Sequence, residues 1–91
     1  MAKKEVNWTG LKEKLEKMDF PQVYFFKFIF PNDNRTLALV EALFGPEAQV
    51  RINKSRNGNY LSVSAKEMMI EPEKVIDRYK EAAKIEGVMS L

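Results

Sequence analysis

The chain has 91 residues, with 15 basic and 13 acidic side chains and 45% hydrophobic residues, which suits one domain over residues 1–91 with a modest core. It contains no cysteine and no histidine, so disulfides, cysteine nucleophiles, Ser-His-Asp triads and histidine-ligated metals are excluded. A net charge of +2 is too small to indicate a nucleic-acid partner by itself. No apolar run reaches the length of about 20 residues that spans a membrane, and no apolar stretch follows the first lysines as it would in a signal peptide. We therefore expect a cytoplasmic protein with no membrane partner.

The N-terminal part predicts a helix that is additional to the rest of the fold. Residues 1–7 are expected to be flexible, residues 8–18 form the helix, and Thr9 is its predicted N-cap. Pro21 is expected to end it, because proline disfavours helical geometry in the preceding residue. One apolar stripe, with steps of three and four residues, is made of Trp8, Leu11, Leu15 and Met18.

Residues 22–30 predict a central strand, because they are mostly aromatic or β-branched and show no helical period. One side carries Tyr24, Phe26, Phe28 and Phe30, and the other carries Val23, Phe25, Lys27 and Ile29. Both sides are largely apolar, so both are expected to be covered, the second less completely because of Lys27. We expect the stripe of the first helix to pack on this second side, near Phe25 and Ile29, with a partner subunit as the alternative.

A turn and a second helix follow the strand. Asn32, Asp33 and Asn34 predict the turn, and Asp33 or Asn34 can cap the helix. Gly45 and Pro46 are expected to stop this helix, with the glycine as a left-handed cap. Its buried stripe is predicted to contain Leu37, Val40, Leu43 and Phe44.

A β-hairpin is predicted from Asn57 and Gly58, a pair typical of a type I′ turn, which needs positive φ at both residues. The register that follows pairs Arg56 with Asn59, Ile52 with Val63 and Val50 with Ala65. This register puts the apolar residues of both strands on one face, and a slip by one residue would separate them. The opposite face is polar and partly basic, and it carries Arg51, Asn53, Ser55, Tyr60, Ser62 and Ser64.

The last third of the chain predicts a helix with Pro72 in its first turn, then Gly87 and a short strand over residues 88–91. The core stripe of this helix is expected to contain Val75, Ile76, Tyr79, Ala82 and Ala83. After the first helix, the order of elements is β-α-β-β-α-β. This order predicts an α+β, ferredoxin-like sandwich over residues 20–91, in which two helices cover one face of a four-stranded antiparallel sheet.

The hairpin also carries a resemblance to a known family. Its residues Ser55, Gly58-Asn59-Tyr60, Ser62 and Val63 resemble the signature of the YbeD-like bacterial proteins, a small family of unknown function. Residues 20–21 and 88–91 are similar to the flanks of that family, so the resemblance covers roughly residues 18–91. It implies a bacterial cytoplasmic origin and a ferredoxin-like fold similar to the ACT-type regulatory domains of amino-acid metabolism. The chain departs from the ACT-type pattern at Pro31-Asn32-Asp33, where a glycine would let an effector approach the backbone.

The function expected from these patterns is that of a non-enzymatic regulatory or adaptor module, which binds a protein partner or a small effector without a cofactor or a metal. Homodimerisation through an edge strand is one arrangement. RNA binding on the sheet is the alternative, less favoured because Tyr60 is the one aromatic residue on the polar face of the hairpin, whereas such sheets use two or three stacking rings. The hairpin serines have no histidine to activate them as nucleophiles. The candidate contact residues are Asn32, Asp33, Asn34, Arg51, Asn53, Ser55, Tyr60 and Ser62.

Overall fold

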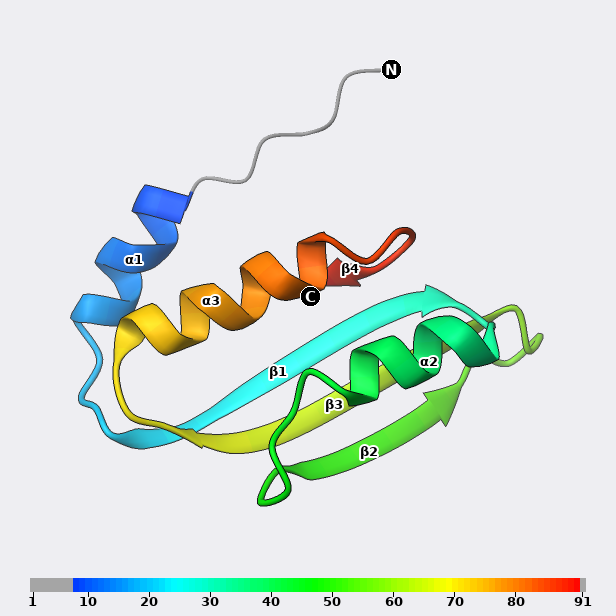
Figure 1. The fold of residues 1–91 in the computed structure, drawn as a ribbon, viewed down its shortest axis with the longest axis horizontal. Coiled ribbons are helices and arrows are strands. Elements are labelled where there is room, and N and C mark those ends of the chain that lie inside the picture. Colours follow the sequence, from blue (N-terminus) through cyan, green and yellow to red (C-terminus); the bar gives the residue numbers. More distant parts are fainter. Residues whose placement is uncertain (1–7, 91) are drawn as a thin grey trace.

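The computed structural model describes residues 8–90, so the predicted flexibility of residues 1–7 lies outside the described residues, as does Leu91 in the predicted last strand. Three helices and four strands follow one another in the order that the sequence predicts. Figure 1 labels them: α1 (Trp8–Glu16), β1 (Gln22–Pro31), α2 (Asn34–Glu41), β2 (Gln49–Lys54), β3 (Tyr60–Met69), α3 (Pro72–Ala83) and β4 (Met89–Ser90).

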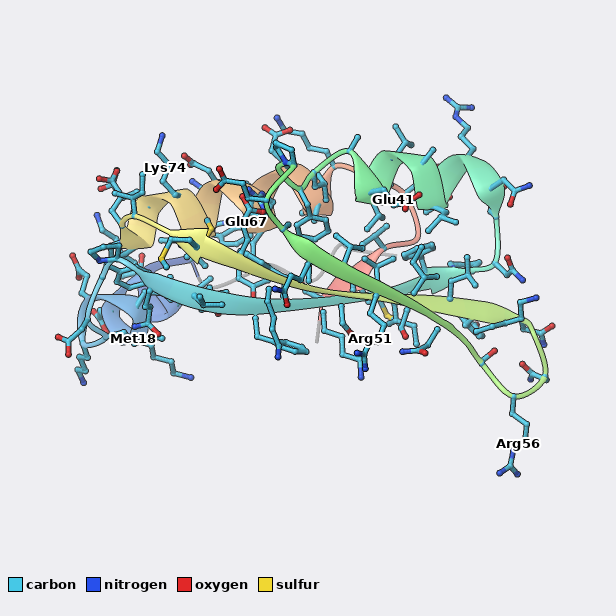
Figure 2. The ribbon with its side chains drawn as sticks, turned by 90° about the horizontal axis from the view of Figure 1, so that it is seen from below. Met18, Glu41, Arg51, Arg56, Glu67 and Lys74 are labelled. Carbon is cyan, nitrogen blue, oxygen red and sulfur yellow. The ribbon has the colours of Figure 1, made fainter. Side chains whose placement is uncertain are left out.

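The four strands form one antiparallel sheet in the order β2-β3-β1-β4. The central strands β1 and β3 pair over ten residues each, from Gln22 opposite Met69 to Pro31 opposite Tyr60. Helices α2 and α3 lie on the same side of this sheet (Figures 1 and 2). The predicted ferredoxin-like α+β architecture is therefore confirmed.

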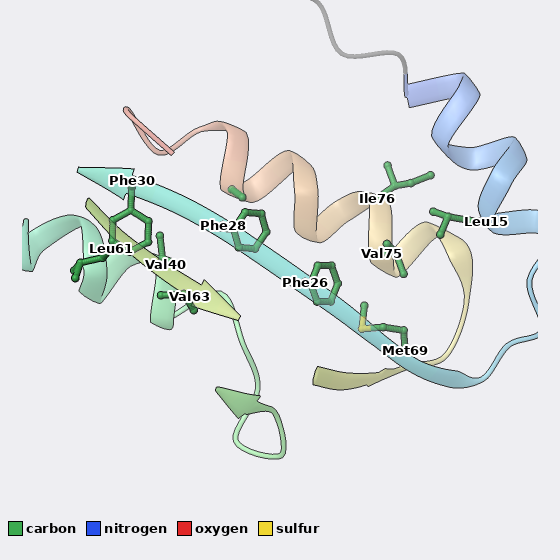
Figure 3. Close-up of a cluster of buried hydrophobic side chains, with 11 residues drawn as sticks. Leu15, Phe26, Phe28, Phe30, Val40, Leu61, Val63, Met69, Val75 and Ile76 are labelled. Atoms are coloured by element: carbon green, nitrogen blue, oxygen red, sulfur yellow. The ribbon is translucent and has the colours of Figure 1, made fainter. Parts of the chain in front are cut away.

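The core lies between the sheet and these two helices. Phe26, Phe28 and Phe30 are completely buried and project from β1 towards the helices, as the alternation along this strand predicts (Figure 3). The Phe26 and Phe28 rings stack at a centroid distance of 6.2 Å, and the Tyr79 ring meets both edge-on. Helices and β3 complete the core with the buried side chains of Val40, Leu61, Val63, Met69, Val75, Ile76 and Ala82. Ala83, predicted to belong to the same stripe, is exposed, because it faces away from the sheet at the end of α3.

Helix α1 does not cover the second face of the sheet, which corrects the sequence-based expectation. It packs against α3, beyond the end of the sheet (Figure 1), and its Leu15 is only 1% exposed. The Nζ of Lys12 lies 3.6 Å from Glu73 of α3. Phe25 keeps 53% of its surface exposed, so the prediction that both faces are covered is also wrong for the described residues. The apolar stripe required an apolar neighbour, and the first turns of α3 supply it.

The ends of the first two helices differ from the prediction in detail. Helix α1 begins at Trp8, which places Thr9 inside the helix rather than at its N-cap. Asp33 caps α2 as predicted, since its Oδ2 accepts a hydrogen bond from the Thr36 backbone N–H at 3.0 Å. Gly45 is not a left-handed cap, because its φ is not positive and α2 ends at Glu41.

The hairpin has the predicted register, with Ile52 opposite Val63 and Val50 opposite Ala65. Its turn differs, because only Gly58 has a positive φ, of 78°, and a type I′ turn needs a second one at Asn57. The Ser55 backbone N–H donates to the Tyr60 carbonyl and the Gly58 N–H donates to the Ser55 carbonyl, each at 2.9 Å. The strands are therefore joined by the four residues 56–59, a length commonly built around a type I turn.

Candidate functional site on the open sheet face

The side of the sheet opposite α2 and α3 is uncovered by the described chain, and we call it the open face. Pairing register and alternation together determine which side chains belong to it. In Figure 2 the labelled Arg51 points to this side, whereas Glu67 lies on the helix side. The open face consists of Val23, Phe25, Lys27 and Ile29 of β1, Gln49, Arg51 and Asn53 of β2, Tyr60, Ser62, Ser64, Lys66 and Met68 of β3, and Met89 of β4.

These side chains form transverse rows, because directly opposed residues of an antiparallel pair point to the same side. The central row is Lys27, Ser64 and Arg51, across three strands. The row beside it is Phe25, Lys66 and Gln49, and the row on the other side is Met89, Ile29, Ser62 and Asn53. Val23 and Met68 form the row at one end, and Tyr60 lies opposite Pro31 at the other. The central row of the open face is thus polar. Phe25 lies in the row beside it, whereas Val23, Met68 and Met89 lie at one end of the face or at the β4 edge.

The charge of the open face has one sign. Lys27, Arg51 and Lys66 are its charged residues, and none of its side chains is a carboxylate. Within residues 8–90, none of these three cations takes part in an ion pair. The Lys66 Nζ lies 6.0 Å from the centre of the half-exposed Phe25 ring, within the range of a cation–π interaction. An anionic partner would therefore meet attraction and no opposing carboxylate on this face.

Two hollows lie on the open face. The larger, of about 320 Å³, is lined by Phe25, Gln49, Val50, Arg51, Asn53, Ser64 and Lys66. The smaller, of about 170 Å³ and closer to the hairpin turn, is lined by Lys27, Ile29, Lys54, Ser55, Tyr60, Leu61 and Ser62. Each combines an aromatic ring with a cation and with amide or hydroxyl groups, so one ligand could use stacking, charge and hydrogen bonds together.

Half of the predicted contact residues are gathered by this face. Arg51, Asn53, Tyr60 and Ser62 belong to it, and all four are at least partly exposed. Ser55 lies beside Tyr60 but shapes the turn, since its Oγ donates to Asn57 Oδ1 and accepts from the Tyr60 N–H, both at 3.0 Å. Phe25, Lys27 and Lys66 also belong to the open face, although they are not among the contact residues predicted from the sequence. The alternation along β1 already places Phe25 and Lys27 on the same side of the strand. Because α1 was expected to cover this side, neither residue was predicted to contact a partner.

The other predicted contacts, in the turn after β1, are occupied by local structure. The Nδ2 of Asn32 donates to the Gly58 carbonyl at 2.9 Å, which ties this turn to the hairpin. Hydrogen bonds from Thr36 to the Asp33 carboxylate, from its hydroxyl and from its N–H, hold the pKa of Asp33 below its ordinary value. Asn34 is exposed in the first turn of α2. These residues therefore position elements around the hairpin end of the sheet.

A hollow of about 650 Å³ lies beside this turn, between the start of α2 and the loop from α3 to β4. The turn after β1, which the resemblance to ACT-type domains implied as part of an effector pocket, contributes Pro31 and Asp33 to the lining of this hollow. Its lining includes both charges, from Asp33, Arg35, Lys84 and Glu86. The Lys84 Nζ already lies 3.3 Å from Glu81 and the Asp33 carboxylate already caps α2. Two of the charged groups that could recognise an amino acid there are therefore engaged.

Of the ion pairs in the described chain, the most buried one lies on the helix side of the sheet and was not predicted. Arg78 of α3 makes two hydrogen bonds to Glu67 of β3, of 2.7 and 3.2 Å, and both side chains are only 16% exposed. The hydrogen bonds from Arg78 are the main cause that holds the pKa of Glu67 below its ordinary value, against the effect of burial. The guanidinium also lies over the Phe26 and Phe44 rings, at 5.3 and 5.2 Å. This carboxylate is therefore ionised and paired, which suits a structural role better than proton transfer.

A pair of tyrosines also lies in this layer, with the Tyr24 and Tyr79 hydroxyls 3.2 Å apart. Burial, with the hydrogen bond to Tyr24, raises the pKa of Tyr79 far above its ordinary value. Its phenol therefore stays protonated at neutral pH and serves packing. Among residues 8–90, no three acidic side chains come together as a metal site, and no helix in this range is long and apolar enough to cross a membrane.

Comparison with known proteins adds a family and nothing more specific. The model of the family described as "Protein of unknown function (DUF493)" matches residues 15–91. The match begins within α1 and includes the whole sheet, so it spans the open face and the hairpin. DUF493 is the family of the YbeD-like proteins, and the resemblance seen in the hairpin is thereby confirmed. A search of the curated proteins found no match, and a search of the solved structures found none.

Proposed function

The chain belongs to the DUF493 family, whose function is unknown, and we propose that it is a non-enzymatic regulatory or adaptor module that binds its partner on the open face. One observation carries this proposal. A four-stranded sheet buries one side against helices and leaves the other free within the described chain, with Phe25, Met68 and Met89 each more than half exposed. Exposed apolar groups of this size, gathered on one face, typically mark an interaction surface.

The absence of a catalytic role in the proposal is supported by the residue types present. The sequence has no histidine or cysteine, which leaves carboxylates, lysines and tyrosines for acid–base work. The mostly buried carboxylate of Glu67 is held by Arg78, and the partly buried phenol of Tyr79 is hydrogen-bonded to the Tyr24 hydroxyl. The side chains of Glu67 and Tyr79 are thus engaged in hydrogen bonds within the fold, whereas the polar groups of the open face are available to contact a partner.

The proposal is tested by placing a photo-crosslinking amino acid at two sites of the full chain in the cells that produce it. One site is Ser62, in the middle of β3 on the open face, and the control is the exposed Asp77 of α3, on the helix side of the sheet. We expect covalent adducts from position 62 and few from position 77. Equal adduct formation at both sites, or none at position 62, would contradict a binding role for the open face.

A small effector is the form of regulation that the resemblance to ACT-type domains implies. Its test is a thermal-shift screen of the purified protein against amino acids and nucleotides. A large shift that persists when Lys27 and Arg51 are both replaced by glutamine would place the ligand away from the open face and overturn the proposal. A shift that is lost in this double variant would support it.

A further inference from the structure

We propose that the partner of the open face is a single-stranded nucleic acid, held by its phosphates on Lys27, Arg51 and Lys66 and by its bases on Phe25 and Tyr60. This inference rests on the proposed function, because it names the partner of that same surface. From the sequence alone, a protein partner or a small effector is preferred to a nucleic acid. The structure changes this preference by uncovering β1, which adds a second exposed ring, Phe25, and a further cation, Lys27, to the open face.

The charge of the open face favours an anionic partner. The three cations occupy two neighbouring rows of the open face, and no carboxylate lies among them. Since neighbouring strands are about 4.8 Å apart, Lys27 and Arg51, on either side of β3, are separated by about 10 Å at the backbone. A partner of the same charge is disfavoured, so a second copy of this chain laid face to face would bring these cations against their own copies. The surface therefore fits a polyanion.

The arrangement of the apolar groups on the open face differs from that of a typical protein interface. A protein interface typically has an apolar centre and a polar rim. Here the central row is Lys27, Ser64 and Arg51, and the most exposed apolar residues, such as Met68 and Met89, lie at an end or an edge. This order is the reverse of a protein hot spot, and it suits a strand whose backbone charges cross the middle of the sheet.

The placement of the two exposed rings, Phe25 and Tyr60, suits the stacking of unpaired bases. Phe25 is 53% exposed and Tyr60 is 44% exposed, on the two central strands of the sheet. Six residues separate the level of Phe25 from that of Tyr60, since Tyr60 lies opposite Pro31, which corresponds to about 20 Å along the strand. Aromatic rings beside cations are what sheets use to stack unpaired bases. Ser62, Ser64 and Asn53 lie between the levels of the two rings and Gln49 lies level with Phe25, and their hydroxyls and amides can hydrogen-bond to base edges.

The test is a titration of the purified full chain into end-labelled octamers of uridylate and of thymidylate, followed by fluorescence anisotropy. We expect binding that weakens about 15- to 20-fold between 50 and 200 mM salt, because three phosphate contacts on a single strand give a logarithmic slope of about −2. Binding of either octamer supports the proposal, and the preferred one tells whether the strand is RNA or DNA. No binding of either octamer at 50 mM salt would overturn it.

Variants separate stacking from charge. Phe25→Ala is expected to weaken binding by about 5- to 100-fold, the loss typical of one stacked base, whereas Leu39→Ala, at an exposed residue of α2, should leave it unchanged. Lys27→Gln should reduce the salt slope by about 0.7. Thermal melting of each variant confirms that it is folded. If Phe25→Ala binds like the unchanged protein, stacking is not involved and the proposal is wrong.

Polyglutamate of matched charge identifies the competing partner, an acidic protein segment. If polyglutamate displaces the octamers as well as unlabelled oligouridylate does, the open face recognises charge alone and the nucleic-acid proposal is overturned. If it displaces them poorly, the bases contribute and the proposal is supported. The photo-crosslinking experiment stays informative in either case, since adducts at position 62 that resist nucleases would uphold the open face as a binding surface and reject a nucleic acid as its partner.

Discussion

At the scale of single residues, the pair of Glu67 and Arg78 is the contact most sensitive to substitution. Gly45 completes it, since its backbone N–H points to Glu67 Oε1 at 3.4 Å, and a Cβ added there would lie 3.3 Å from Oε2. The close approach of a carboxylate, rather than an unusual φ, thus explains this glycine. Removal of either partner leaves the other charge half-buried without its hydrogen bonds, which costs more than a surface ion pair.

Glu67→Gln is therefore expected to lower the free energy of unfolding by about 1 to 3 kcal/mol at pH 7. Because the folded pKa of Glu67 lies below its ordinary value, its contribution is fully present above the unfolded pKa of about 4.3 and is lost as the pH falls through the folded pKa. The difference between the two proteins should thus shrink below about pH 4. Chemical denaturation at several pH values measures it, with Asp77→Asn as the control on the exposed side of α3. A difference that stays constant down to pH 3 would contradict the role of the ionised carboxylate.

Gly58 is the residue on which the hairpin turn depends, because it is the turn position with a positive φ. Gly58→Val is expected to destabilise the protein by about 1 to 3 kcal/mol, since a β-branched residue resists this conformation. Gly58→Asn should cost clearly less, because asparagine tolerates the left-handed region. Urea denaturation of both variants provides the measurement, and equal stability of Gly58→Val and the unchanged protein would rule out the described turn.

At the scale of elements, the packing of α1 is the main departure from the sequence-based expectation. Leu15→Ala is expected to destabilise the protein by about 2 to 5 kcal/mol, because it leaves a cavity between α1 and the core. Phe25→Ser should cost clearly less, about 1 kcal/mol, since only about half of the ring is buried and no helix covers it. If α1 lay on the open face instead, Phe25→Ser would be the more damaging of the two. The pair of denaturation curves thus distinguishes the two positions of α1.

The strands could be predicted because their side chains alternate strictly. The buried rings of β1 and the register that pairs Ile52 with Val63 both follow from a period of two residues. The turn type could not be settled in the same way, because Asn57 and Gly58 fit loops of two residues and of four. The position of α1 was equally undetermined, since an amphipathic stripe shows that a helix needs an apolar neighbour without showing which one.

The site was only partly predictable for the same reason. Arg51, Asn53, Tyr60 and Ser62 were found from the polar parity of the hairpin, whereas Phe25 was assigned to a covered face. The ion pair of Glu67 and Arg78 joins a strand to a helix, and no pattern of neighbouring residues in the sequence predicts such a contact. The strand faces and the hairpin register, which follow from a short period in the sequence, could therefore be predicted. The position of α1 and the contact between Glu67 and Arg78, which depend on how helices pack on the sheet, could not.

At the scale of the whole molecule, acidic and basic side chains are distributed unevenly over the two sides of the sheet. The open face carries three cations and no carboxylate, although the chain as a whole has 13 acidic side chains and a net charge of only +2. The acidic groups of the described chain therefore lie in the helices, the loops and the helix side of the sheet. A small net charge of the chain is thus compatible with an open face that carries only positive charges, and the proposal of a nucleic-acid partner depends on this property.

The central claim is that the chain leaves one side of its own sheet uncovered, and two adjacent methionines test it most directly. Met68 is 55% exposed on the open face, whereas its neighbour Met69 is 4% exposed in the core. Under mild peroxide, followed by tandem mass spectrometry of the native protein, Met68 and the 57% exposed Met89 should oxidise rapidly and Met69 should be protected. Oxidation of Met69 at the rate of Met68, or protection of Met68 in the isolated protein, would contradict the account.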